Sequence, residues 1–127
     1  MKISEFLVED EAKLIGPHEG QEVQLLLSGE KPLALLGPKE FAKCKPHIKS
    51  GNLVNAGRVN GYARASLYLV TIPGQEWRAR QFKKVYDLLK LLPHTRGVES
   101  KPYHIKLGLL LGYPKEAIRH FIQTRFR

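Results

Sequence analysis

The chain has 127 residues and a formal net charge of +9, and its length predicts one domain over residues 1–127 with a single core. Its hydrophobic content of 43% is typical of globular proteins, and no apolar run approaches the roughly 18 residues of a membrane span. The single cysteine excludes an internal disulfide, and the acidic residues near the N-terminus do not fit a signal peptide, so a cytoplasmic protein is expected.

The charges are unevenly distributed along the chain. Residues 1–30 contain seven acidic side chains and two lysines, a balance of −5, whereas residues 31–127 contain 19 basic and five acidic side chains, a balance of +14. This asymmetry predicts a strongly positive surface, which is the footprint of proteins that bind nucleic acid or another polyanion. The alternative is that the acidic segment folds back over the basic body and cancels part of its field.

The first part of the chain predicts two elements and leaves a third undecided. The apolar alternation in Met1–Ile15 fits either an edge strand or a frayed helix. Glu19–Ser28 has the pattern of a helix that ends at Gly29. Leu33–Leu36 is a short apolar run between turn signals, which predicts a buried strand.

The basic stretch Pro38–Ile48 predicts only one helical turn, because Pro46 is expected to end it. Cys44 and His47 have the spacing of half a zinc site, but a structural zinc ion needs four ligands and the sequence offers no second pair. A partly buried thiol is the preferred interpretation, and no metal is expected. Four lysines cluster in and beside this stretch: Lys39, Lys43, Lys45 and Lys49.

A β-hairpin is predicted next. Leu53–Val59 and Tyr62–Ile72 are rich in strand-forming residues, and Asn60–Gly61 between them predicts a two-residue loop. One face of the second strand would join Tyr62, Arg64 and Tyr68 with the nearby Arg58, and such a face can stack nucleic-acid bases. The preferred alternative is that a helix covers this face.

The longest predicted helix is Gln75–Leu92, with a main apolar face from Ala79 to Leu89 and a second apolar strip beside it. The second strip consists of Trp77, Leu88 and Leu91. Its preferred interpretation is burial between the sheet and the C-terminal helices, and the alternative is a homodimer interface.

The segment Ser100–Arg127 predicts a helical hairpin, because Ser100 and Pro102 suit a helix start and Gly112 followed by Pro114 suits a helix end and a new start. Its spacing also fits a DNA-binding helix-turn-helix, but few residues at the start of the second helix can hydrogen-bond to base edges. A structural hairpin is therefore preferred. The predicted fold class is α+β: a small, mostly antiparallel sheet of about three to four strands, an N-terminal helix and three C-terminal helices.

No catalytic signature is found. The sequence has no phosphate-binding loop, no dinucleotide-binding glycine motif and no pair of carboxylates in an apolar stretch. We therefore expect no catalytic residues and no cofactor, and the pattern favours a non-catalytic protein.

The stretches LLGYPKEAIRHFI and EGQEVQLLLSGEKPLAL together resemble small uncharacterised bacterial proteins. The resemblance covers about a quarter of the chain and rests on the pattern LLGYPxxxIxxFI. It implies a bacterial protein, and it implies no activity and no site residues.

Two functional hypotheses follow from the sequence. In the first, the protein is an accessory factor that binds nucleic acid, with phosphate contacts from Arg78, Lys84, Lys101, Lys115, Arg119 and Arg127. In the second, it has no nucleic-acid activity and is a homodimeric interaction module built on Trp77, Leu88 and Leu91, or a small-ligand-binding module with a pocket lined by Tyr62, Tyr68 and Tyr86.

Overall fold

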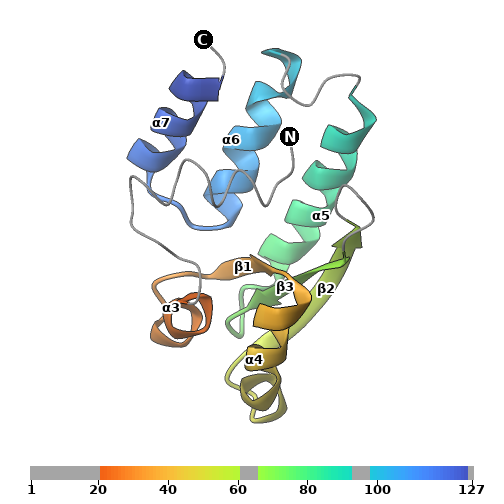
Figure 1. Ribbon diagram of the computed structural model, residues 1–127, viewed down its shortest axis with the longest axis vertical. Helices are drawn as coiled ribbons and strands as arrows, with labels where there is room; N and C mark the ends of the chain where they lie inside the picture. The colour runs from red at the N-terminus through yellow and green to blue at the C-terminus, as the bar shows by residue number, and fades with distance from the viewer. Residues whose placement is uncertain (1–20, 61–65, 93–97, 126–127) are drawn as a thin grey trace.

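The computed structural model describes residues 21–60, 66–92 and 98–125 (Figure 1). A three-stranded antiparallel sheet has the order β1-β3-β2, so β3 lies in the centre. The α+β class is confirmed. The strands are β1 (Leu33–Leu36), β2 (Val54–Asn60) and β3 (Ser66–Thr71), and the helices are α3 (Glu22–Ser28), α4 (Pro38–Lys49), α5 (Glu76–Leu91), α6 (Lys101–Leu110) and α7 (Lys115–Arg125), with a 3-10 turn η3 (Val98–Ser100) before α6.

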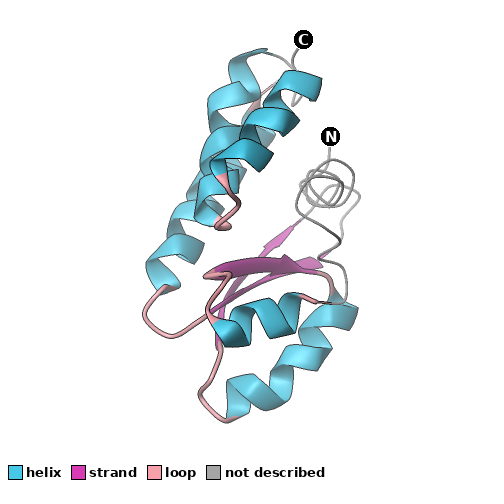
Figure 2. Cartoon of the chain, turned by 90° about the vertical axis from the view of Figure 1, so that its left-hand side faces the viewer, coloured by secondary structure: helices cyan, strands magenta, loops and turns pink. Residues whose placement is uncertain are grey.

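Helices cover both faces of the sheet, with α3 and α4 on one side and α5, α6 and α7 on the other (Figures 1 and 2). Successive residues of a strand point to opposite faces, so each strand contributes to two cores. In β1, Leu33 and Leu35 pack with α5–α7, whereas Ala34 and Leu36 pack with α3 and α4. All four residues of β1 are buried for this reason, as predicted.

The helix α4 is longer than the sequence indicated, and the prediction that Pro46 ends it is wrong. Pro46 lies inside the helix, which continues to Lys49. Proline removes one backbone donor, but its own carbonyl still accepts the amide of Ser50 at 3.1 Å. The apolar side of α4, formed by Phe41, Cys44 and Ile48, packs against the sheet, and this tertiary packing offsets the local cost.

The hairpin of β2 and β3 is confirmed, but the predicted two-residue loop at Asn60–Gly61 is wrong. Val59 pairs with Leu67 and Asn60 with Ser66, so the connection comprises residues 61–65, which lie outside the described residues. Cross-strand partners share a face, and this register places Val59 beside Leu67 and Leu69 in the core under α5. Burial of these side chains sets the register more strongly than the local turn signal does.

Two other predictions concern residues that lie outside the described part of the chain. The segment Met1–Ile15 lies outside them, so its choice between strand and helix is not decided. Tyr62 and Arg64 of the predicted aromatic face also lie outside them. The end of α3 is confirmed, because Gly29 adopts the left-handed conformation with φ 81°.

Candidate functional site

Arg78 is a structural contact between two helices. Its Nε donates to Gln75 Oε1 at 2.8 Å, and its Nη1 lies 3.2 Å from the carbonyl oxygens of both Leu109 and Leu110. These carbonyls belong to the last turn of α6, where backbone acceptors lack the usual i+4 amide, and the carbonyl of Leu109 also accepts from the Gly112 amide at 3.0 Å. The guanidinium therefore completes the end of α6 and joins it to α5, which leaves fewer of its donors for a phosphate.

The other predicted phosphate contacts are only partly brought together. Lys115 and Arg119 lie one turn apart on α7 and line the same groove between α6 and α7. Lys84 is exposed on α5 and Lys101 is half-buried at the start of α6, and neither lines that groove. Arg127 lies outside the described residues. The predicted set is thus divided between separate surfaces of the α5–α7 layer.

The second apolar strip of α5 is exposed. Trp77 is 45% exposed, Leu88 50% and Leu91 79%, so the preferred interpretation of intramolecular burial is wrong. Leu88 and Leu91 lie together near the C-terminal end of α5. Trp77 lies eleven residues before Leu88, about 16 Å away along the helix, and Arg78 covers its ring at 4.8 Å. The predicted interface is therefore two separate patches.

The exposed side of α4 carries a row of lysines. Phe41, Cys44 and Ile48 face the sheet, whereas the four lysines of α4 are exposed. Lys43 pairs with Glu40, the acidic residue of α4, at 3.1 Å. Lys39, Lys45 and Lys49 are exposed and have no ion pair among the described residues.

An aromatic stack joins this lysine row to the sheet. Phe41 of α4 stacks on Tyr68 of β3, with ring centres 4.1 Å apart and planes inclined by 9°. Lys45 Nζ lies 5.9 Å from the centre of the Phe41 ring. On the other side, the exposed Arg58 is the cross-strand partner of Tyr68. Lys45 and the two rings thus follow one another from α4 to β3, and Arg58 belongs to the strand beside Tyr68. The four exposed lysines of α4 and Arg58, the cross-strand neighbour of the ring that α4 covers, are together called here the α4 basic surface: Lys39, Lys43, Lys45, Lys49 and Arg58.

The sequence indicated part of this surface and missed the rest. The second face of β3 is covered by a helix, as preferred, and the covering helix is α4. The lysine cluster was visible in the sequence, but its extent depends on α4 continuing past Pro46, because only then does Lys49 project from the same helix as Lys39 and Lys45. The lysine spacing is the signal that could have indicated a longer helix.

The thiol of Cys44 is buried between α4 and the sheet. Burial raises its pKa to about 11, and the nearby carboxylates of Glu40 and Glu22 act in the same direction. At neutral pH the group is therefore a protonated thiol, which is a poor nucleophile and metal ligand. Within the described residues, no three His, Cys, Asp or Glu side chains gather as a metal site would require.

A buried ion pair joins the two helical layers at the end of the sheet. Lys31 Nζ lies 2.9 Å from Glu22 Oε2, and the ammonium lies 4.8 Å from the centre of the Tyr113 ring. Burial lowers the pKa of Lys31, and the carboxylate of Glu22 partly opposes this shift. The pair links α3 and β1 to the turn between α6 and α7, and its geometry is that of a structural contact.

The predicted tyrosine pocket does not form. Tyr86 is buried in the core between the sheet and α5–α7, whereas Tyr68 stacks on α4 at the opposite face. Tyr62 lies outside the described residues. Two tyrosines on opposite faces of a sheet cannot line one cavity, so the prediction that Tyr68 and Tyr86 line one ligand pocket is wrong.

No helix in the described part of the chain is long and apolar enough to cross a membrane. Neither a protein-family model, nor a curated protein, nor a solved structure matches this chain, so its function is inferred from its own surfaces.

Proposed function

We propose that the protein is a non-catalytic bacterial accessory protein of the cytoplasm, and that it binds nucleic acid through the α4 basic surface. The observation that carries this proposal is the stack of Lys45, Phe41 and Tyr68, which lies beside Arg58 of the neighbouring strand and on the helix that carries three further exposed lysines. Lysines and arginines that gather on one face supply phosphate contacts, which dominate the affinity of most nucleic-acid-binding proteins.

The aromatic stack supports backbone binding over base recognition. Phe41 and Tyr68 cover each other's faces, and Lys45 covers part of the outer side of Phe41. Base stacking on an aromatic residue requires a free ring face. The α4 basic surface therefore offers phosphate contacts without a reader of sequence, and we propose binding that is largely independent of sequence.

The test is a variant in which Lys39, Lys45 and Lys49 are all replaced by glutamine, titrated into labelled single- and double-stranded DNA and RNA at several salt concentrations. Each lost phosphate contact lowers the slope of log K against log salt by about 0.9 on duplex DNA and about 0.7 on single strands. We expect the slope on duplex DNA to fall by about 2 to 3, and the affinity at physiological salt to fall roughly 10- to 100-fold.

A matched control separates the contribution of the α4 basic surface to binding from the contribution of the overall charge. Replacing the exposed Lys83, Lys84 and Lys106 by glutamine removes the same charge from the other helical layer. We expect this variant to bind within about threefold of the wild type. Equal losses in both variants would mean that only the net charge of +9 attracts nucleic acid. A loss in the control alone would move the contacts to α5 and α6.

A homodimer is the second candidate function, favoured by the exposure of Leu88 and Leu91 one turn apart on α5. Replacing Leu88 by glutamate places a charge in such an interface and should convert a dimer to a monomer, as measured by light scattering. The control is Leu27→Glu on α3, where the leucine is 42% exposed and lies on the other helical layer. A wild-type mass equal to the 14.4 kDa of one chain would exclude this candidate.

A further inference from the structure

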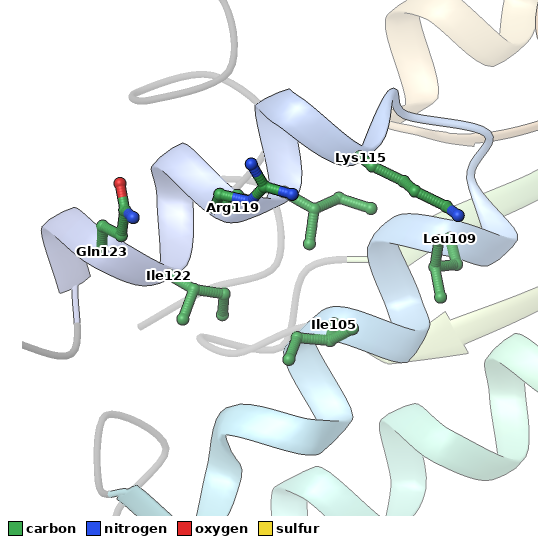
Figure 3. A pocket seen from close by; sticks show the side chains of 7 residues that line it. Ile105, Leu109, Lys115, Arg119, Ile122 and Gln123 are labelled. Atoms are coloured by element: carbon green, nitrogen blue, oxygen red, sulfur yellow. The ribbon is translucent and has the colours of Figure 1, made fainter.

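An open groove between α6 and α7 has an apolar floor. Ile105 and Leu109 of α6 and Ile118 and Ile122 of α7 line a hollow of about 380 Å³ (Figure 3). Figure 3 shows the side chains of Ile105 and Ile122 between the two helices, and the side chain of Leu109 on α6. Leu109 is 46% exposed, so the groove is open to solvent, unlike an enclosed ligand cavity.

The apolar surface continues across α6 toward α5. A second hollow of about 490 Å³ shares Ile105 and Leu109 with the first. Its other apolar residues are Trp77 of α5 and Pro102 and Leu110 of α6. The two hollows and the ridge of α6 between them form one surface, called here the α6 apolar surface. Contiguous exposed apolar area of this kind marks interaction sites in globular proteins.

Basic side chains border the α6 apolar surface on both margins. Lys115 and Arg119 lie along the α7 margin, and in Figure 3 the side chain of Lys115 extends toward Leu109. Lys106 and Arg78 lie on the α5 side, although Arg78 is held by the carbonyls of α6. None of the described residues that line either hollow is acidic. The fitting partner is therefore apolar on one side and negatively charged at its edges.

We propose that the α6 apolar surface binds an acidic amphipathic helix of a partner protein. The floor presents two pairs of apolar side chains, Ile105 with Leu109 and Ile118 with Ile122, and the members of each pair are one helical turn apart. This repeat matches the i, i+4 and i+7 anchors of a helix that lies in a groove. Acidic residues beside the anchors would face Lys115 and Arg119, whose spacing of four residues is again one turn. The proposal does not depend on nucleic-acid binding, because it uses the opposite helical layer.

The test uses the full chain and a fluorescein-labelled helical peptide of about four turns, with leucines at i, i+4 and i+7 and glutamates at the flanking positions. We expect saturable binding with a Kd on the order of micromolar, as measured by fluorescence anisotropy. A peptide of the same composition with the leucines scrambled should bind at least about tenfold more weakly. Replacing its glutamates by lysines should abolish binding.

Two variants at leucines of similar exposure locate the binding surface. Leu109→Asn removes the centre of the α6 apolar surface without changing the charge, and we expect it to weaken peptide binding by about tenfold or more. Leu27→Asn changes a leucine that is 42% exposed on α3 in the opposite helical layer, and we expect it to bind within about twofold of the wild type. Circular dichroism of both variants checks that the helices are retained.

Three outcomes would overturn the proposal. Equal binding of the scrambled peptide would show that charge alone attracts the probe. Unchanged binding by Leu109→Asn would place the peptide elsewhere. Sedimentation with phosphatidylserine vesicles that Leu109→Asn abolishes, together with no binding of the helical peptide, would assign the surface to a membrane instead.

Discussion

Replacing Glu22 by leucine is expected to lower the free energy of unfolding by about 3–5 kcal/mol, because it leaves the ammonium of Lys31 buried without its counter-ion. The side chain of Lys31 is only 5% exposed, and its contact with the Tyr113 ring replaces little of a carboxylate 2.9 Å away. Urea unfolding at neutral pH measures the loss.

The pH dependence of that loss has a definite sign. Burial already lowers the pKa of Lys31 below its usual value of 10.5, and removal of the Glu22 carboxylate removes an influence that raises it. Between the folded-state pKa and 10.5 the unfolded chain binds more protons, so stability rises with pH in that window. The Glu22→Leu variant should therefore recover stability relative to the wild type as the solution is made alkaline.

Two controls test whether burial is the cause. Asp87→Leu breaks the exposed pair with Lys90, whose atoms are 3.6 Å apart, and should cost less than about 1 kcal/mol. The double variant Glu22→Leu with Lys31→Met removes both charges and should recover most of the lost stability. If Asp87→Leu lowered the free energy of unfolding as much as Glu22→Leu does, desolvation of Lys31 would not be the cause of the loss in Glu22→Leu.

Alanine at Gly112 should destabilise the protein by about 2–5 kcal/mol. Gly112 has φ +83°, a conformation that costs a residue with a side chain about 1–2 kcal/mol. A Cβ atom there would also lie 2.5 Å from Cδ of Pro32, and a proline ring cannot rotate away. The steric overlap adds an expected 1–3 kcal/mol, roughly the cost of overpacking a core.

Gly29 provides the matched comparison. Its φ of +81° is nearly the same, but no atom lies within 4 Å of the Cβ it would gain. Gly29→Ala should therefore cost only about 1–2 kcal/mol, the conformational part alone. Urea unfolding measures the loss in free energy of unfolding for both variants, and the difference between the two losses is the cost of the overlap with Pro32. Equal losses would show that this overlap is unimportant.

The contact between Gly112 and Pro32 also bears on the helix-turn-helix comparison. Tyr113 beside it is buried, and Lys31 lies over its ring. The turn between α6 and α7 is thus packed against the start of β1. This packing agrees with a structural hairpin, the preferred interpretation of the sequence.

Periodicity predicted those parts of the fold in which local pattern and tertiary burial agree. The main face of α5 is an example, since Ala79, Phe82 and Leu89 are all buried. The strand β1 is another, because a short apolar run between turn signals suits a strand covered on both sides. In these elements each residue's local preference and its final environment favour the same structure.

Prediction from the sequence failed where contacts between residues distant in the chain determine the local structure. Pro46 ends a helix by local rules, yet packing of Phe41 and Ile48 on the sheet maintains α4 through it. Similarly, no local pattern indicates that Arg78 binds carbonyls 31 and 32 residues away. The candidate sites could not be predicted for the same reason, because sequence order does not show which of the many lysines share a surface.

The bulge in β2 has a consequence for association of the sheet. Asn55 pairs with Val70 and Gly57 with Leu69, so Ala56 is an extra residue without a cross-strand partner. β2 is an edge strand, and a long regular edge is a template on which another chain can add a strand. A bulge increases the local twist and interrupts the regular row of backbone groups. The irregular β2 and the four-residue β1 at the opposite edge therefore oppose edge-to-edge aggregation and the joining of two chains into one continuous sheet.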